Sequence, residues 1–276
     1  MTFAMEKVTV PILQEMKHGH RKIVGLVAWD YQMARIAERA GVDLVSVGDS
    51  VGTNLWGQPN PLEVTLDQMV VVCQAVRRGV ERALVSCDFP FGPLQEGPRE
   101  ALRAAVRLVK EAGADMVKLD GAADFLKSVR AIVDAGIPVF AQMGITPQTA
   151  LRHGVDYSRM SHPDAEVPAG MAERLVDDAR ALQDAGAALL DFTNSGPVVG
   201  PKVVGAVSIP VLGGFGGGPW LDGRIRMAHA AIGYAASGLD EPPDTYANVA
   251  RVAFDAISAY STDVREGRQI RGGRPL

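Results

Sequence analysis

Three stretches of the chain share one pattern: ERAGVDLVSV at residues 38–47, KEAGADMVKL at 110–119 and QDAGAALLDF at 183–192. In each of them an Ala-Gly pair follows a helical pattern, and a mostly apolar run comes next. A glycine just past a helix adopts the left-handed backbone conformation at little cost. Each stretch therefore predicts the end of a helix and the start of a buried strand, as in folds that alternate helices with parallel strands.

Strand-like runs of this kind recur along the whole chain. The predicted strands span 23–28, 43–47, 83–87, 115–119, 137–143, 187–193, 209–213 and 230–235. The amphipathic segments predicted as helices include 31–40, 66–78, 100–112, 122–134 and 169–185. Eight β/α units without a dividing linker predict a single TIM (β/α)8 barrel over residues 1–276, with a short N-terminal extension and a C-terminal helical segment. A doubly wound α/β sheet is the alternative.

Composition narrows the class of protein. The 276 residues carry 28 Lys plus Arg against 32 Asp plus Glu, a net charge of −4, so no global field favours nucleic acid or anionic lipid. Cys73 and Cys87 form no CxxC or Cys/His cluster, which argues against a disulfide framework or a zinc site. The sequence shows no leader pattern and no run of about 18 apolar residues. We therefore expect a cytoplasmic enzyme with no nucleic-acid or membrane partner.

Polar residues gather where the predicted strands end. A TIM barrel places its chemistry at this end of the strands. One Asp after a strand is usually a helix cap or a turn residue, but several acids and a lysine at the same end of successive strands favour a site. The candidates are Asp49, Ser50, Asp88, Lys118, Asp120, Gln142, Asp191, Thr193 and Asn194.

These side chains suit metal-assisted chemistry on a 2-oxo acid. Asp49 and Asp88 offer hard oxygen ligands to Mg²⁺, which keeps positions open for water or substrate. A 2-oxo acid could fill those positions with a carboxylate oxygen and a keto oxygen, and the metal would then stabilise an enolate. Lys118 could add positive charge beside the developing oxyanion. Ser50 could hold the carboxylate at the start of the following helix.

Six motifs carry a family resemblance. In chain order they are WDY at 29–31, VSVGDSVG at 45–52, CDFPFG at 87–92, VKLDG at 117–121, MGITPQ at 143–148 and DGRIRMAH at 222–229. Together they resemble the ketopantoate hydroxymethyltransferase family from about residue 8 to residue 260. The resemblance implies a magnesium-dependent TIM barrel, or one using another divalent cation, that forms a large homo-oligomer such as a decamer. It also implies hydroxymethyl transfer from methylenetetrahydrofolate to 2-oxoisovalerate.

The resemblance assigns roles to individual residues. Asp49 and Asp88 match the family's magnesium ligands, and Asp120 stands where the family has a third acidic residue beside the metal. Ser50 and Lys118 match its contacts to the 2-oxo acid. Asp88 and Gln142 are also expected beside the substrate. By this resemblance, the family's Glu is shortened to Asp at position 120, so that this carboxylate is expected to act through water.

Two departures bear on the reaction. The family has His where this chain has Gln142, and its catalytic Glu at the end of strand six is replaced here by Thr193 or Asn194. Neither of these two can remove a carbon-bound proton, so Thr193 and Asn194 are catalytic candidates by position alone. Strand residues two apart point the same way, which makes Asp191 a candidate for the relocated base. An ion pair or hydrogen bond with a neighbouring strand is the alternative role for Asp191.

Two further segments depart from the family pattern. The loop at 152–171 is expected over the mouth of the site and predicts a changed second substrate. His153 and His162 in this loop, and His229 further on, are more simply read as exposed or structural histidines. The run GGFGGG at 213–218 matches no nucleotide fingerprint, so a tight turn or a close backbone approach to the substrate is the favoured use.

The sequence thus predicts a Mg²⁺-dependent enzyme that makes or breaks a C–C bond through the enolate of a 2-oxo acid, with an altered substrate or donor. A metal-dependent hydrolase or lyase of a 2-oxo diacid is one alternative, and an inactive homologue is another. Clustered charges at Asp49, Asp88, Lys118 and Asp120 argue against the inactive homologue.

Overall fold

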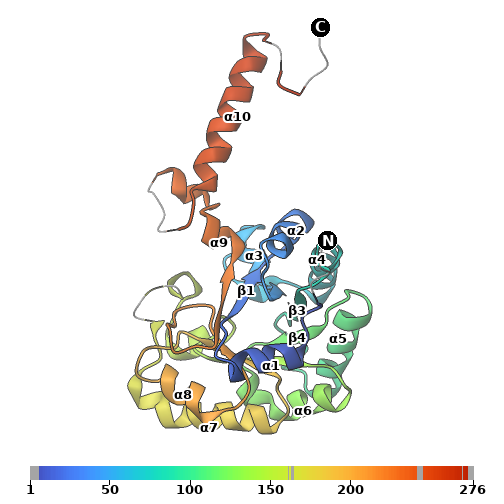
Figure 1. Ribbon diagram of the computed structural model, residues 1–276, viewed down its shortest axis with the longest axis vertical. Coiled ribbons are helices and arrows are strands. Elements are labelled where there is room, and N and C mark those ends of the chain that lie inside the picture. Colours follow the sequence, from blue (N-terminus) through green and yellow to red (C-terminus); the bar gives the residue numbers. More distant parts are fainter. Residues whose placement is uncertain (1–5, 161, 163–164, 241–244, 269, 273–276) are drawn as a thin grey trace. The chain divides into compact units, whose positions relative to one another are not determined.

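A barrel of parallel strands forms the main body of the protein (Figure 1). The computed structural model describes residues 6–160, 162, 165–240, 245–268 and 270–272. Within them, eight strands follow the order β7-β6-β5-β4-β3-β2-β1-β8. Backbone hydrogen bonds from Asp222 N to Val211 O (2.9 Å) and from Ile225 N to Gly213 O (3.1 Å) bring the two ends of this order together. The predicted TIM barrel is confirmed.

The elements have the following bounds. The strands are β1 Ile23–Val27, β2 Leu44–Val47, β3 Leu84–Asp88, β4 Met116–Leu119, β5 Val139–Gly144, β6 Leu189–Thr193, β7 Val211–Leu212 and β8 Gly223–Met227. The helices named in Figure 1 are α1 Val10–His18, α2 Tyr31–Arg39, α3 Val51–Asn54, α4 Leu66–Gly79, α5 Pro98–Lys110, α6 Leu126–Asp134, α7 Ala172–Asp184, α8 Gly200–Ala206, α9 Ala228–Ile232 and α10 Val249–Arg265. None of the helices in the described part of the chain is long and apolar enough to span a membrane.

Seven of the eight predicted strands are confirmed, and the eighth is wrong. Residues 230–235 were expected as a strand, but Ala228–Ile232 forms the short helix α9, which ends at Gly233 with a left-handed φ of 68°. The last strand is Gly223–Met227, where buried and exposed residues alternate. Arg224 and Arg226 on its exposed side interrupt the apolar run, so the strand lacks the pattern by which the other strands are predicted.

The chain divides into two compact units, residues 1–226 and 227–276. The first unit carries the strands of the barrel and the helices α1 to α8. The second unit carries α9, a 3-10 turn at Ala236–Leu239 and the helix α10, which supplies the predicted C-terminal helical segment.

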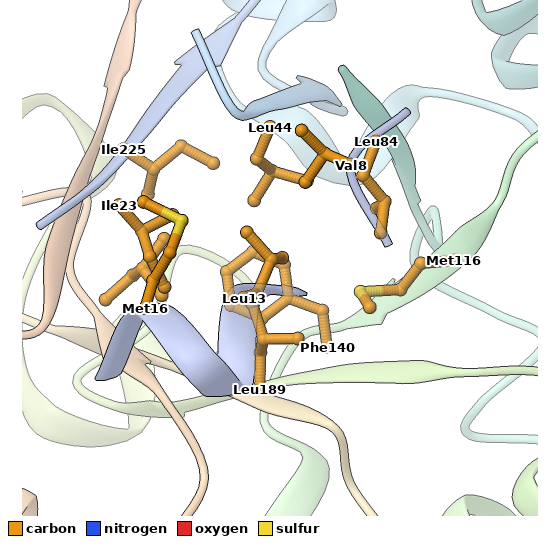
Figure 2. Close-up of a cluster of buried hydrophobic side chains, with 11 residues drawn as sticks. Val8, Leu13, Met16, Ile23, Leu44, Leu84, Met116, Phe140, Leu189 and Ile225 are labelled. Carbon is orange, nitrogen blue, oxygen red and sulfur yellow. The ribbon is translucent and has the colours of Figure 1, made fainter. Parts of the chain in front are cut away.

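One apolar layer closes the N-terminal end of the barrel. Every strand contributes one buried residue to it, and α1 adds the side chains of Leu13 and Met16, which lie among the strand residues in Figure 2. The strand residues are Ile23, Leu44, Leu84, Met116, Phe140, Leu189, Leu212 and Ile225. Because α1 fills this end, polar groups of the barrel interior lie toward the carboxyl ends of the strands.

A polar layer lies directly above the apolar one. Side chains two residues apart on a strand share a face, so the residue two positions after each apolar one also points inward. In β2 to β6 these positions hold Ser46, Ser86, Lys118, Gln142 and Asp191, all at most 7% exposed. Because inward-facing residues recur every two positions along a strand, a layer of polar and charged side chains directly follows the apolar layer.

Truncation of Leu13 tests the role of α1 as the floor of the barrel. Leu13 is fully buried, so Leu13→Ala should lower the free energy of unfolding by about 3 kcal/mol through lost burial and an unfilled cavity. Glu15→Ala, at an exposed position on the same helix, should change it by less than about 0.5 kcal/mol. Urea denaturation of the two variants measures both values, and equal losses would contradict this role.

Candidate active site

Three carboxylates gather at the carboxyl ends of adjacent strands. Asp49 follows β2, Asp88 ends β3 and Asp120 follows β4, and each is at most 9% exposed. They are close enough for the charges of Asp88 and Asp120 to act on Asp49. The structure thus brings together the three acids that the sequence singled out.

Lys118 lies at the centre of the polar layer. Its Nζ is 3.2 Å from Asp88 Oδ2, 2.9 Å from Gln142 Oε1 and 3.3 Å from Asp191 Oδ2. An ammonium group has three donors, so these three oxygens can engage all of them. Its contact to Asp191 joins β4 to β6 across the intervening strand β5.

The side chain of Gln142 links Lys118 to Thr193. Its Oε1 accepts from Lys118, and its Nε2 donates to Thr193 Oγ1 at 2.8 Å. Thr193 and Gln142 are 0% and 4% exposed. By the resemblance, Gln142 stands where the family has a histidine, and Thr193 is one of the two residues that can stand in place of its glutamate.

Asp191 is held from two sides. Its Oδ2 faces Lys118, and its Oδ1 accepts from Gly214 N at 3.2 Å. Asp191 and Thr193 both reach the network around Lys118 and Gln142, so the prediction that they share the inner face of β6 is confirmed. The ion pair that was the alternative role for Asp191 is present, and its role as a base stays a prediction.

Two residues of the motif at 143–148 support the carboxylates, and the sequence analysis missed them. Gln148 Nε2 donates to Asp49 Oδ2 and to the carbonyl of Phe89, both at 2.9 Å. Its backbone N–H donates to Asp120 Oδ2 at 3.2 Å, and the Thr146 hydroxyl donates to Asp120 Oδ1. Both residues stand in the quoted motif, so the signal was there, but only the fold shows which acids they contact.

Burial dominates the electrostatics of the acids. It raises the pKa of Asp49 to about 8, with repulsion from Asp88 adding to the shift. It also raises the pKa of Asp120 to about 6, although hydrogen bonds from Thr146 and Gln148 oppose it. The pKa of Asp88 is raised because burial outweighs the attraction to Lys118.

The surroundings of Lys118 favour its charged form. Burial by itself lowers the pKa of this ammonium, but the charges of Asp88 and Asp191, with smaller contributions from Asp49 and Asp120, outweigh burial and raise it. Lys118 therefore stays protonated, and the interior holds one fixed cation among four carboxyl groups.

The donor set fits a hard divalent cation bound by two carboxylates. The described residues contain no group of three or more His, Cys, Asp or Glu side chains placed to hold a metal ion by themselves. Mg²⁺ commonly uses one or two carboxylates and fills its other positions with water and substrate oxygens. Asp49 and Asp88 suit that role, because burial raises the pKa of each carboxyl group and a bound cation would stabilise the charged form. Both oxygens of Asp120 already accept hydrogen bonds, so Asp120 suits a position behind the metal.

Ser50 and Asn194 follow the ends of β2 and β6. Ser50 precedes the four-residue helix α3, and its hydroxyl makes no hydrogen bond to the described part of the chain. Asn194 follows β6 with a left-handed φ of 56°, which is uncommon for a residue other than glycine. It is 2% exposed, and its Nδ2 has no hydrogen-bond partner among the described residues.

The glycine-rich run at 213–218 packs against the end of β6. Asn194 N donates to the carbonyl of Phe215 at 2.8 Å, and a Cβ at Gly216 would come within 3.1 Å of Asn194 Cα. Gly216 and Gly217 also have left-handed φ values of 62° and 83°. The glycines thus serve a tight turn that packs closely against β6, one of the two predicted uses, and a close approach to the substrate stays a prediction.

One residue of the segment at 152–171 contacts the region that follows β2. Tyr157 places its Oη 3.3 Å from Thr53 Oγ1, and Thr53 belongs to α3, which begins just after Asp49 and Ser50. Tyr157 therefore links this segment to the part of the chain that carries the first carboxylate.

The three histidines lie in other surroundings. His153 is exposed and lines a cavity of about 180 Å³ together with Arg174; burial and two nearby arginines lower the pKa of its imidazole. His162 is exposed, between residues that lie outside the described part. His229 belongs to the second unit and stacks edge-on with Tyr234, their ring centroids 4.8 Å apart.

The raised pKa values predict how stability depends on pH when a chelator is present. Asp side chains in the unfolded chain titrate near pH 4, whereas Asp120 and Asp49 hold their protons up to about pH 6 and 8 in the folded protein. The folded state therefore binds more protons between pH 4 and 8, and stability falls as pH rises, by roughly 1.4 kcal/mol per pH unit for each such group.

Urea denaturation at several pH values between 5 and 8.5 measures this slope. Asp49→Asn removes one of the groups, so the wild type should lose stability relative to the variant as pH rises. A constant difference between the two proteins across this window would contradict the prediction.

Solved structures with a similar fold are enzymes. The crystal structure of 2,3-dimethylmalate lyase, a member of the PEP mutase/isocitrate lyase superfamily, matches with a TM-score of 0.61 at 18% identity, covering 96% of this chain and 91% of that chain. An oxaloacetate acetylhydrolase bound to 3,3-difluorooxalacetate matches with a TM-score of 0.57 at 18% identity, covering 96% and 99%. At this identity the likeness shows the shared barrel.

Sequence relatives are closer. The 3-methyl-2-oxobutanoate hydroxymethyltransferase of Salinibacter ruber is 38% identical over 262 residues, which cover 95% of this chain and 96% of the relative. The enzyme of the same name from Pyrococcus abyssi is 40% identical over 268 residues, covering 96% and 90%. The model of the family described as ketopantoate hydroxymethyltransferase matches residues 7–269. The chain therefore belongs to the ketopantoate hydroxymethyltransferase family of enzymes.

Proposed function

We propose that this protein is a Mg²⁺-dependent enzyme that acts on a small 2-oxo acid through an enolate and makes or breaks a carbon–carbon bond. The observation that carries the proposal is the buried contact of Lys118 with Asp88, beside Asp49, at the carboxyl ends of adjacent barrel strands. These residues belong to the motifs by which the chain resembles its family.

Each residue of the cluster has a part in binding the substrate. Asp49 and Asp88 would hold the cation, which when bound polarises the 2-oxo group and stabilises the enolate. Asp120 would orient water beside it, because its own oxygens are held by Thr146 and Gln148. The hydroxyl of Ser50 would donate to the substrate carboxylate.

Lys118 would act mainly through its charge. Its three near neighbours can engage all of its donors, so a hydrogen bond to the substrate would require one of them to move. Positive charge fixed in a dry interior favours an oxyanion nearby without any rearrangement at the moment of reaction.

The relatives' name specifies hydroxymethyl transfer to 3-methyl-2-oxobutanoate, and methylenetetrahydrofolate is the proposed donor if this chain runs the same reaction. Thr193 and Gln142 favour an altered substrate or donor, because neither side chain can take up a proton from carbon at neutral pH. We further propose that the protein is a cytoplasmic homo-oligomer, as the family resemblance implies.

Isotope exchange tests the proposed function directly. In heavy water, the single C3 proton of 2-oxoisovalerate, or a C3 proton of a related 2-oxo acid, should exchange when the protein and Mg²⁺ are both present, and the exchange can be followed by proton NMR. Asp49→Asn should abolish the exchange because it removes a cation ligand.

Asp184→Asn is the matched control for this experiment. It makes the same change of charge at an exposed position at the end of α7, which leads into the opposite end of β6, and it should exchange at the wild-type rate. If no acid of a panel of 2-oxo acids exchanges with Mg²⁺ present, the enolate proposal is wrong.

Asp191 is the carboxylate on the inner face of β6 and therefore our candidate for the base. Asp191→Asn should lower the exchange rate at least about 100-fold, the typical contribution of a general base. Binding of the 2-oxo acid with Mg²⁺, measured by calorimetry, should change much less. Exchange at the wild-type rate in this variant would show that Asp191 serves only to hold Lys118 and Gly214.

A further inference from the structure

The amide of Gln142 has one possible orientation. Lys118 can only donate hydrogen bonds, so the side-chain atom of Gln142 that faces it at 2.9 Å must be the oxygen. The amide nitrogen then faces Thr193 Oγ1 at 2.8 Å and donates to it. The charge of Lys118 thus fixes the direction of both hydrogen bonds.

This direction determines what the Thr193 hydroxyl can do. Its oxygen already accepts from Gln142, so its own hydrogen has to point elsewhere. Thr193 is fully buried, and Gln142 is its hydrogen-bond partner among the described residues. A buried donor without an acceptor is costly, and a substrate atom that supplied the acceptor would remove that cost.

The next residue, Asn194, is a second and independent case of a buried donor. The amide nitrogen of Asn194 is buried and has no hydrogen-bond partner in the described part of the chain. Its backbone is held in the left-handed region, which an asparagine adopts at some cost. The end of β6 therefore holds two donors, Thr193 and Asn194, whose hydrogens lack acceptors among the described residues.

We propose that the end of β6 recognises an oxygen atom of the substrate beyond the 2-oxo group, a hydroxyl or carboxylate oxygen, with Thr193 as a specificity-determining donor and Gln142 as the positioning residue that aims it. The proposal rests on the proposed function and narrows its substrate to oxygenated 2-oxo acids. A carboxylate at position 193 would repel a carboxylate oxygen and could only accept from a hydroxyl, whereas a hydroxyl that is forced to donate can bind either kind of oxygen.

Three ligands that differ at one carbon test this preference. 2-Oxobutanoate, 4-hydroxy-2-oxobutanoate and freshly dissolved oxaloacetate carry a methyl, a hydroxymethyl and a carboxylate at C4. Calorimetric titration of the full-length protein with Mg²⁺ should show that at least one of the two oxygenated acids binds about tenfold or more tightly than 2-oxobutanoate. The tighter of the two identifies the kind of oxygen that is recognised.

Variants separate hydrogen bonding from packing. Thr193→Val keeps the volume but removes the donor, so the preference should fall to within about twofold. Thr193→Ser keeps the hydroxyl and should keep most of the preference. In Gln142→Glu the new carboxylate still accepts from Lys118, but it offers Thr193 an acceptor in place of a donor. The Thr193 hydroxyl then donates to residue 142, so the preference for the oxygenated acid should be lost although Thr193 is unchanged.

The outcomes distinguish this inference from the proposed function. If 2-oxobutanoate binds with Mg²⁺ as tightly as both oxygenated acids, or if Thr193→Val weakens all three equally, the inference is wrong while the proposed function stands. If Gln142→Glu keeps the wild-type preference, the relay through Gln142 is wrong. If none of the three acids binds with Mg²⁺, the proposed function and the inference fail together.

Discussion

The buried ammonium of Lys118 is the interaction on which the rest of the site depends. A charge inside a barrel is tolerated only when oxygens surround it, because an uncompensated buried charge is very costly. Asp88, Gln142 and Asp191 supply these oxygens from three different strands. Because all three residues approach Lys118 Nζ, these contacts tie β3, β5 and β6 to β4, the strand that carries Lys118.

The layering of the barrel makes room for that charge. The apolar layer formed by the eight strands and α1 excludes water from below, and the polar layer above it carries the chemistry. The three carboxylates at the mouth have raised pKa values, so the arrangement lowers stability at neutral pH. Ligand-binding sites commonly lower the stability of the free protein in this way, because the bound ligand supplies the charge or the hydrogen-bond partner that the protein alone lacks.

The end of β6 is where we expect this chain to differ chemically from the pattern of its family. Asp191, on the inner face of the strand and one layer deeper than Thr193, is tied to Lys118 and Gly214. The buried hydroxyl of Thr193 and the buried amide of Asn194 stand at the end of the strand. A substrate that reaches this point would therefore meet hydrogen-bond donors.

The sequence by itself determined the β/α alternation, the barrel, seven of its strands and the acids at the strand ends, because periodicity and motifs are local properties of the chain. It misplaced the last strand, since the arginines of Gly223–Met227 broke the apolar run. Only the tertiary structure decided that Asp191 pairs with Lys118, that Gln148 supports Asp49 and that Gln142 directs the hydroxyl of Thr193. These contacts join residues 51 to 99 positions apart, and their direction follows from which donors and acceptors the closed barrel brings within reach.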